Sequence, residues 1–500
     1  MVTTTRVVAP APRDGVLNIH TTYVFTFFYW AARSILFQQV IAGFVFVLTN
    51  SNQPVGVVKG VQGISQLVFS FPAGYIADHT RRDRVLRFAG FLGLAAALLT
   101  AVAVWKCNLA LLNGAFALWG LFAAFQSPAM EAIFAESVPH GRRSFPFMIK
   151  YNVSNVAMVV GPLLSVLLFL YVGDNWRVNE LQPVLLCGCG LVAIASLLLF
   201  RFNDDHTLSE DSEDERDVDL DGDPQAAVVP RTHSRRSLDS EALRTPSVAG
   251  DDLVIEYDYS DHDDDANTED DLESEQNQLK TIKISTETSS LLQSKAVDDV
   301  QSKMPASQFL FLRSHHVPLL IFLSDFIISN GAGMTVYFFP LFFKEEYGLS
   351  PIHVSLLFLV QPLIVMVLSF LGQRASKALG RMPIIVTTRI LATICLLGMS
   401  YAQPLVLQIT LFLMRGGMMR CSQPLRRSVL MDFVRKEVRA RWNALEGISV
   451  FSYSGSAVLG GYLVDLYDYR TCFFITSFVY FVGLSLELFL LPLTKHAIEK

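Results

Sequence analysis

The sequence predicts an all-α integral membrane protein of twelve transmembrane helices, arranged in two six-helix bundles with a long disordered linker between them. Hydrophobic residues make up 51% of the 500 residues, and 37 residues are Phe. They gather in twelve apolar stretches, each close to the roughly 20 residues that a helix needs to cross a bilayer. A long acidic segment separates the sixth stretch from the seventh.

The first six stretches follow an N-terminal tail, residues 1–18. This tail has no short apolar core followed by a cleavage site, so we expect no removable signal peptide. The first predicted bundle is residues 19–201. Its spans are predicted at 19–48, 54–77, 85–105, 109–136, 145–172 and 183–201.

Residues 202–316 form the predicted linker. Between residues 202 and 300 there are 29 Asp and Glu against 8 Lys and Arg, a net charge of −21, while the whole chain carries −6. Low hydropathy with charge of one sign cannot bury enough apolar surface to offset the entropy of ordering the chain. We therefore expect this linker to be disordered.

The second predicted bundle is residues 317–492, and a short tail of residues 493–500 follows it. Its spans are predicted at 317–343, 352–372, 382–402, 404–431, 442–465 and 471–492. Thirteen Lys and Arg lie in the short loops on one side of the twelve spans and four on the other, which predicts that the basic side is cytoplasmic. Because the number of spans is even, both termini and the linker are predicted on that side too.

The two halves repeat one another. The segment from Gly74 to Arg82 recurs 298 residues later, from Gly372 to Arg381, and the segment from Pro128 recurs 296 residues later. Two segments at almost the same offset indicate a parallel repeat of six spans, which is one architecture of secondary transporters.

The loop between the second and third spans carries the most specific motif, Gly74-x-x-x-Asp78-x-x-x-Arg82. It resembles the signature of the major facilitator superfamily, from which it departs at His79, Arg81 and Asp83. The resemblance covers both membrane halves and excludes the linker. It implies a fold of two pseudo-symmetric six-helix bundles and transport of a small solute by alternating access.

The motif residues are candidates for a gate. A carboxylate such as Asp78 can cap a helix N-terminus or pair with a nearby arginine. We expect Arg84 to reach Glu136 at the end of the fourth span, in a pair that forms and breaks as the bundles rock. The alternative is that these charges only set the topology. The full set of gating candidates is Gly74, Asp78, Arg82, Arg84, Glu136, Gly372 and Arg381.

Ionisable side chains at membrane depth are costly and indicate function. In the fold that the resemblance implies, spans 1, 4, 7 and 10 line a central cavity. This makes Arg33, Asp325 and Arg415 candidates for substrate contact. The alternative is that Arg33 and Asp325 pair with each other or with neighbours and hold helices together. The neutral polar candidates in the same spans are Gln38, Gln126 and Asn330.

Other residues of the spans indicate helix packing rather than substrate contact. For Glu446 and Glu487 we expect a role in holding helices together, because polar side chains can join neighbouring helices within a bilayer. The alternative is that such a residue, where it lies near a helix end, extends its charged group to the membrane surface. The Gly460-Gly461 pair is expected to permit close packing of two helices, since glycine presents no side chain to its neighbour.

The excess of deep arginines favours an anionic or zwitterionic substrate, with Asp325 as a candidate proton carrier. A non-transporting receptor or sensor on the same fold is the alternative. The sequence shows no zinc spacing, nucleophile elbow or phosphate-binding loop, so we expect no enzyme activity, no metal and no cofactor. The expected partners are the lipid bilayer, a small-molecule substrate and protons, and no nucleic acid.

The linker carries short sorting and modification patterns. Glu287-Thr-Ser-Ser-Leu291-Leu292 resembles an acidic dileucine sorting signal, and Ser237 and Thr245 lie in kinase-like contexts. The alternative is ordinary low-complexity sequence. These patterns predict cytoplasmic sorting adaptors or kinases as partners, and a plasma, endosomal or vacuolar membrane as the location.

Overall fold

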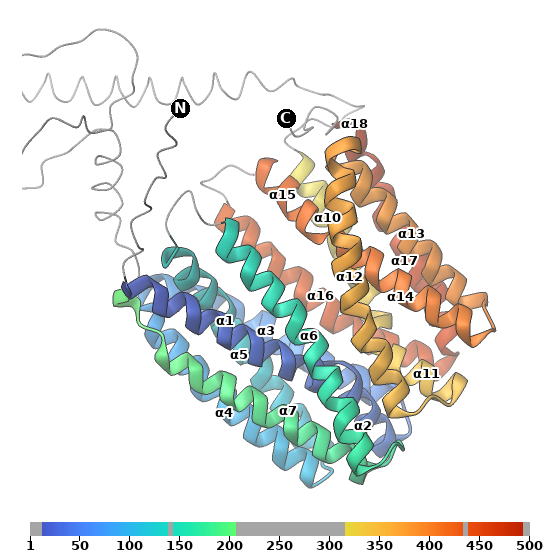
Figure 1. Cartoon of the computed structure of the whole chain (residues 1–500). Coiled ribbons are helices and arrows are strands. Elements are labelled where there is room, and N and C mark those ends of the chain that lie inside the picture. The colour runs from blue at the N-terminus through green and yellow to red at the C-terminus, as the bar shows by residue number, and fades with distance from the viewer. Residues whose placement is uncertain (1–12, 139–143, 207–315, 434–438, 494–500) are drawn as a thin grey trace, which may run out of the picture. The chain divides into compact units, whose positions relative to one another are not determined.

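The computed structural model describes residues 13–138, 144–206, 316–433 and 439–493 of the chain, and within these ranges every regular element is a helix (Figure 1). The predicted sorting signal Glu287, Leu291 and Leu292 lies outside the described residues. The kinase-like sites in the linker lie outside them as well.

The first half contains six helical units at the six predicted positions. The first unit is continuous but changes its winding within the predicted span 19–48. In chain order the elements are α1 (Arg13–Ser34), η1 (Ile35–Gln39, a π-helix), α2 (Val40–Thr49), α3 (Gln53–His79), α4 (Arg82–Trp105), α5 (Leu109–Glu136), α6 (Ser144–Val172), α7 (Val178–Leu198), η2 (Leu199–Arg201) and η3 (Asp204–His206).

The second half contains the other six units, again at the predicted positions. Two of them are broken: the seventh at Tyr337 and the tenth at Ser422. The elements are α10 (Val317–Val336), α11 (Phe339–Tyr347), α12 (Pro351–Leu379), α13 (Arg381–Tyr401), α14 (Leu405–Cys421), α15 (Gln423–Phe433), α16 (Arg439–Leu466), α17 (Tyr469–Leu488) and α18 (Leu490–Leu493).

Among the described residues, nine helical segments are long and apolar enough to cross a membrane by length and composition. The units α3, α14–α15 and α16 fall outside this group. Helix α14 has only 17 residues before its break. Helices α3 and α16 pack along one another, so part of each faces protein rather than lipid and can hold polar side chains. The predicted class, an all-helical multi-pass membrane protein, is confirmed.

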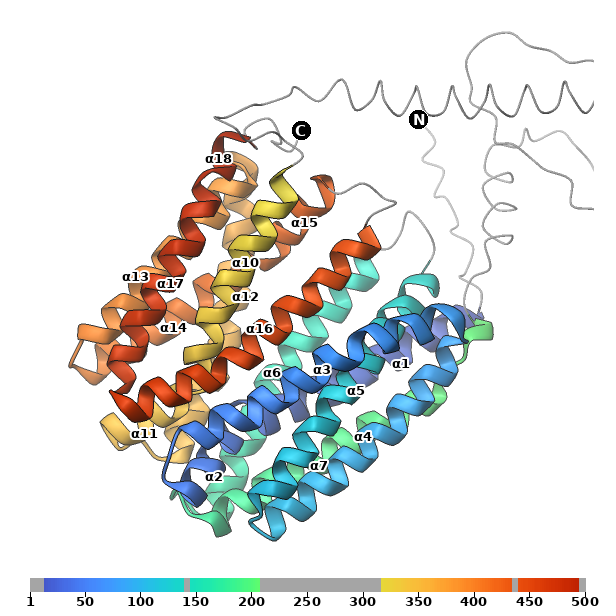
Figure 2. The ribbon, with the colours of Figure 1, turned by 180° about the vertical axis from the view of Figure 1, so that it is seen from behind.

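The two halves meet along two pairs of helices. Helix α3 lies beside α16, and α6 lies beside α12 (Figure 2). On α3, Gly56, Gly60 and Gly63 share one face, and a Cβ on any of them would collide with atoms of α16. Small residues at such spacing let two helix backbones approach closely. The predicted packing role of Gly460 and Gly461 is confirmed, because Cβ atoms there would meet the backbones of Met334 and Asn52.

Each bundle has two ends, which we name by their loops. The basic end is where α3 passes into α4 and α5 ends; the opposite end is where α2 passes into α3 and α16 into α17. Among the described residues, the hydrogen bonds that join the two halves lie in the opposite-end part of the molecule. The halves are therefore held together toward that end.

Helix capping supplies part of this closure. The Asp465 carboxylate, at the end of α16, accepts the backbone N–H groups of Asn52 and Gln53 at 2.8 and 2.9 Å, where α3 begins. The Asp174 carboxylate, just after α6, accepts the N–H of Ile352 at 2.8 Å in the first turn of α12. Each acid satisfies N–H groups that a helix start leaves without an intrahelical partner.

The predicted linker, residues 202–316, begins inside the described structure. Residues Asn203, Asp204 and Asp205 lie against the basic end of the first half, with Asp204 and Asp205 in η3. Their side chains and backbone find partners on α1 and at the start of α4. The described structure at this point therefore extends through His206, beyond the predicted end of the bundle at residue 201.

Candidate functional site

The basic end of the first half carries an ion pair between Arg82, the first residue of α4, and Glu136, the last residue of α5. The sequence predicts Arg84 as the partner of Glu136. Arg84 is instead exposed, two positions further along α4. Two residues along a helix turn a side chain by about 200°, so only one of these arginines can face α5.

Asp83, which departs from the family signature, is buried, with 3% of its surface exposed. Its two carboxylate oxygens accept from Arg81 Nε at 3.2 Å and from Arg87 Nη2 at 3.0 Å. A carboxylate in the first turn of α4 also interacts favourably with the positive end of the helix dipole. The departure from the signature therefore replaces a basic residue with the centre of a small charge network.

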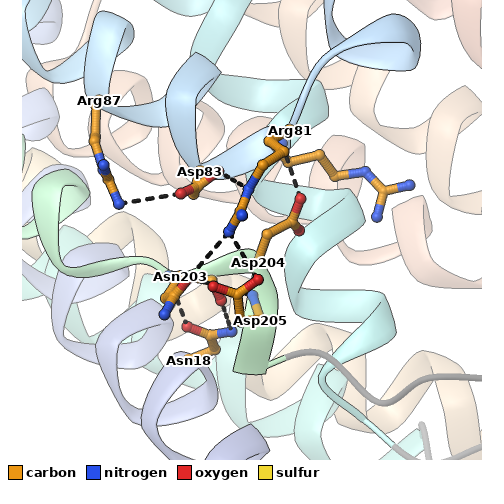
Figure 3. Close-up of polar contacts among 8 residues, drawn as sticks. Asn18, Arg81, Asp83, Arg87, Asn203, Asp204 and Asp205 are labelled. Atoms are coloured by element: carbon orange, nitrogen blue, oxygen red, sulfur yellow. Dashed lines mark hydrogen bonds and ion pairs between the residues drawn. The ribbon is translucent and has the colours of Figure 1, made fainter. Parts of the chain in front are cut away.

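The start of the linker joins this network (Figure 3). Asp205 Oδ1 pairs with Arg81 Nη2 at 2.9 Å, and Asp204 Oδ2 accepts the backbone N–H of Arg82 at 3.1 Å. The pKa of the Arg81 guanidinium is raised, first by its bond to Asp205 and then by its bond to Asp83. On the far side of this linker stub, residues 203–205, the buried Asn18 of α1 donates to the carbonyl of Asn203 at 2.9 Å.

A shallow surface pocket lies at this network, lined by Ala77, Thr80, Arg81, Arg82, Glu136, Asp204 and Asp205. Asp78 belongs to α3 just beside it, but its side chain lies outside the described residues. The contacts of residues 203–205 and of Asn18 were not predicted. The overall composition of the linker indicates disorder, and it does not show that its first three residues bind the bundle.

The remaining gating candidates have ordinary surroundings. A Cβ on Gly74 would meet open space, and one on Gly372 would meet Ile384 at 3.9 Å, an ordinary van der Waals contact. In the second half, Arg381 donates to Ser428 Oγ at 2.7 Å, which joins α13 to α15. These two motif glycines therefore do not serve a close approach of helices in this conformation.

Arg33, at the end of α1, has aromatic neighbours. Its Nη1 lies 3.4 Å from the Tyr29 hydroxyl, and its guanidinium carbon lies 5.3 Å from the centre of the Trp30 ring and 5.8 Å from that of Phe37. Among the described side chains, no carboxylate pairs with it. The alternative of an Arg33–Asp325 pair is therefore absent from this conformation.

Lys59 on α3 is a deep cation that the sequence reasoning missed. It is 3% exposed, and its Nζ lies 4.7 Å from the centre of the Phe37 ring, 5.0 Å from that of Phe116 and 5.0 Å from that of Tyr337. Phe37 and Phe116 belong to the first half and Tyr337 to the second. The sequence did contain a signal for this residue, because Lys59 is a lone lysine within the apolar span predicted at 54–77.

Arg415 is buried within the second half. It donates from Nη2 to the Tyr480 hydroxyl at 2.8 Å, and its guanidinium carbon lies 4.9 Å from the centre of the Phe339 ring. Arg420, about one and a half helical turns further along, is half-buried, and the basic residues Arg415 and Arg33 are both near enough to act on it electrostatically.

The neutral polar candidates occupy mixed places. Gln38 is half-buried in the π-helix η1, Gln126 is buried on α5, and Asn330 donates to the carbonyl of Phe326 within its own helix at 2.9 Å. Gln39, beside Gln38, donates to Ser355 Oγ of α12 at 2.9 Å and so joins the halves. Single π-turns inside helices are frequent at functional sites, and η1 also holds Phe37.

Asp325 lies in a charge network inside the second half. It pairs with Arg426 of α15 and, at 3.2 Å, with Arg389 Nη2 of α13, and Arg389 also pairs with Glu487 of α17. Glu487 accepts from Ser324 Oγ at 3.0 Å as well. This arrangement corresponds to the predicted alternative in which deep charges hold helices together, and the expected structural role of Glu487 fits it.

The deep charged side chains fall into two groups, those that pair with a residue of opposite charge and those that do not. Acids and bases compensate one another in the Asp325 network and at the basic end. Between the halves, the described residues place Arg33 and Lys59 beside aromatic rings, and no described acid lies within ion-pair distance of either cation.

Comparison with known proteins identifies relatives of this sequence. The model of the family described as Major Facilitator Superfamily matches residues 22–445 and 321–500. A curated relative, a Na(+), Li(+), K(+)/H(+) antiporter from Planococcus maritimus, is 34% identical over 161 residues. That match covers 30% of this chain and 36% of the relative, so it spans about a third of the relative's length.

Solved structures similar to this one share its fold at low sequence identity. A single-residue mutant of the nucleoside transporter NupG has a TM-score of 0.58 at 11% identity, covering 94% of this chain and 99% of that one. A POT family transporter in complex with 5-aminolevulinic acid has a TM-score of 0.58 at 12% identity, covering 99% and 98%. A peptide transporter POT in complex with sulfate has a TM-score of 0.58 at 14% identity, covering 98% and 96%.

Proposed function

This chain belongs to the Major Facilitator Superfamily and is a multi-pass membrane transporter, and we propose that it moves a small anionic or zwitterionic solute by alternating access, coupled to protons. The observation that carries the proposal is the pair of deep basic residues Arg33 and Lys59, beside aromatic rings and without a described acid as partner. Uncompensated charge at membrane depth needs a partner, and an anionic substrate supplies one.

Alternating access is supported by where the halves join. The hydrogen bonds of Asp465 and Asp174 across the halves lie at the opposite end, so this conformation is closed there. We place the basic end on the cytoplasmic side, following the excess of basic residues in its loops. In that orientation the described conformation is closed toward the outside, and a transport cycle requires these caps to break.

Coupling to protons is supported by the name of the antiporter relative. The sequence predicts Asp325 as a candidate proton carrier. Its two arginine partners instead hold it in a network between helices, and we propose this structural role for it. The relative's name also favours a second candidate function, exchange of an alkali cation for protons.

Flux in reconstituted vesicles tests the proposal. Purified protein in proteoliposomes should accumulate one or more labelled organic anions or amino acids when an inward proton gradient is imposed, and Arg33→Gln should abolish that uptake. Flux of sodium or potassium with no anion uptake would favour the cation exchanger. Absence of any flux, with specific binding of a solute, would favour the receptor alternative.

A further inference from the structure

Lys59 is the deep cation whose surroundings are most enclosed. It is 3% exposed, and three ring faces surround its ammonium group: Phe37 and Phe116 from the first half and Tyr337 from the second. Ring faces attract a cation, yet they replace only part of the hydration that it loses on burial. Among the described residues, no carboxylate lies within ion-pair distance of the Lys59 ammonium group.

Arg33 lies next to the same enclosure. The centre of the Phe37 ring is 5.8 Å from the Arg33 guanidinium carbon and 4.7 Å from Lys59 Nζ, so the two cations cannot be further apart than these two distances together. The two positive charges also repel one another at this range. Helix α1 thus supplies a planar guanidinium and α3 a compact ammonium to one small region.

Near this pair, the side chains of the second half that the structure describes are neutral or basic. The centres of the Tyr337 and Tyr453 rings lie 5.3 Å apart, and the Tyr337 ring is one of the three around Lys59. No described acid from α10 or α14 enters the region. Among the described side chains, the region therefore holds two basic groups and no acid, a composition that matches a doubly charged anion better than a singly charged one.

We propose that Arg33 and Lys59 form the two ends of a binding subsite for an oxyanion that carries two negative charges, such as a phosphate or a dicarboxylate. This inference rests on the proposed transport function and narrows its substrate class. A zwitterion would bring an ammonium group toward two cations, and a monoanion would leave one of them uncompensated. Lys59 is then the residue that selects for the second charge.

Ligand binding to purified protein tests the subsite without depending on flux. The probes are inorganic phosphate, succinate and acetate, each titrated at constant ionic strength against chloride while thermal unfolding is followed. We expect phosphate or succinate to stabilise the wild type more than acetate does. Comparison of phosphate with succinate then shows whether the site prefers a phosphate or a dicarboxylate.

The deciding variant is Lys59→Met, which keeps an unbranched apolar chain among the rings. We expect its apparent dissociation constant for the stabilising dianion to rise about tenfold or more, while that for acetate changes by less than about threefold. Lys344→Met is the matched control. Lys344 also lies over a ring, 4.4 Å from the centre of Phe46, but it has Glu345 as an ion-pair partner, so its loss should leave both constants unchanged.

Two results would overturn the proposal: a wild type that no dianion stabilises beyond acetate, or a Lys59→Met protein with wild-type dianion affinity. If Lys59→Met fails to fold, Lys59→Arg decides, because it keeps the charge and must keep the preference for a dianion over acetate. Vesicle flux that persists with the same selectivity in Lys59→Met would reject the subsite while leaving the transport function intact.

Discussion

Asp174 and Asp465 occupy equivalent positions in the two halves, 291 residues apart, and each carboxylate caps the start of a helix in the other half. Asp465 closes the start of α3, and Asp174 closes the start of α12. These two helices are the second spans of their bundles. The two caps are therefore equivalent contacts under the internal repeat of the chain. An exchange of caps between halves gives the closed end a pair of bonds that must break when that end opens.

The Asp465 cap should stabilise the closed conformation. Its carboxylate accepts from the Asn52 and Gln53 N–H groups and from the Ser51 hydroxyl at 2.5 Å. Because the site is exposed, we expect Asp465→Ala to shift the closed–open equilibrium by only about 1 kcal/mol, roughly fivefold. Spin labels at Tyr171 and Tyr467, one at the opposite end of each half, should report a larger population of long distances.

Asp468→Ala is the matched control for this measurement. Asp468 is also an acid near the end of α16, but it caps α17 within its own half by accepting the N–H of Thr471. Its removal should leave the distance distribution between the two labels unchanged. Equal broadening in both variants would mean that the Asp465 cap has no special role in closure.

The Arg82–Glu136 pair should show measurable coupling. Both side chains are partly exposed, so we expect a coupling free energy of about 0.5 kcal/mol in a double-mutant cycle with Arg82→Gln and Glu136→Gln. The same cycle with Arg84→Gln should give none. Thermal unfolding in a constant detergent provides the measurement, and coupling to Arg84 instead would restore the sequence-based assignment.

The spans could be predicted from the sequence because the length and polarity of an apolar stretch are local properties. The closed end and its caps could not, because Asp465 and Asn52 are 413 residues apart and nothing local records their contact. The partner of Glu136 depended on where α4 begins. Arg82 and Arg84 lie two residues, about 200°, apart on that helix, and the sequence alone does not show which of them faces α5.

The candidate transport site was predicted only in part. Arg33 was found because an arginine within an apolar span is conspicuous. Lys59 was missed, although it lies in the predicted span 54–77, and its surroundings depend on rings from both halves. The partners of Asp325 come from helices α13 and α15, and no sequence spacing indicates which charges meet inside a bundle.

Removing only one member of the buried Arg389–Glu487 ion pair should lower the stability of the protein strongly. Both side chains are almost fully buried, at 3% and 2% exposure. Arg389→Met leaves Glu487 without its guanidinium, and we expect a loss of about 3–5 kcal/mol of stability. Adding Glu487→Leu should recover most of that loss, as followed by chemical unfolding in mild detergent. A double variant no more stable than Arg389→Met would contradict this assignment.

The linker stub should define how much of the linker can be removed. Deletion of residues 207–300 keeps Asn203, Asp204 and Asp205 against the first half, and we expect it to leave thermal stability and vesicle transport unchanged. Deletion of 203–300 also removes Asp205, one of the two acids paired with Arg81, the acceptor of the Arg82 N–H, and the Asn203 carbonyl that accepts from the buried Asn18. We expect that longer deletion to lower the unfolding midpoint by a few degrees, and equal midpoints for the two deletions would show that the stub contributes nothing.

Arg33 and Asp325 should behave as independent residues. The structure joins Asp325 to Arg389 and Arg426 and surrounds Arg33 with Tyr29, Trp30 and Phe37. Effects of substitutions at sites without a shared partner add to within about 0.3–0.5 kcal/mol. The stability loss of the Arg33→Ala, Asp325→Asn double variant should therefore equal the two single losses together.

The same two positions should also differ in what their loss affects. Arg33→Lys keeps the charge but loses the planar fork that grips an oxyanion, so substrate affinity should fall while stability changes little. Asp325→Asn should lower stability first, because it leaves Arg389 and Arg426 without one of their carboxylates. If the double variant instead recovers stability that each single variant loses, the two residues pair in a conformation other than this one. Wild-type affinity in a well-folded Arg33→Ala protein would remove Arg33 from the substrate site.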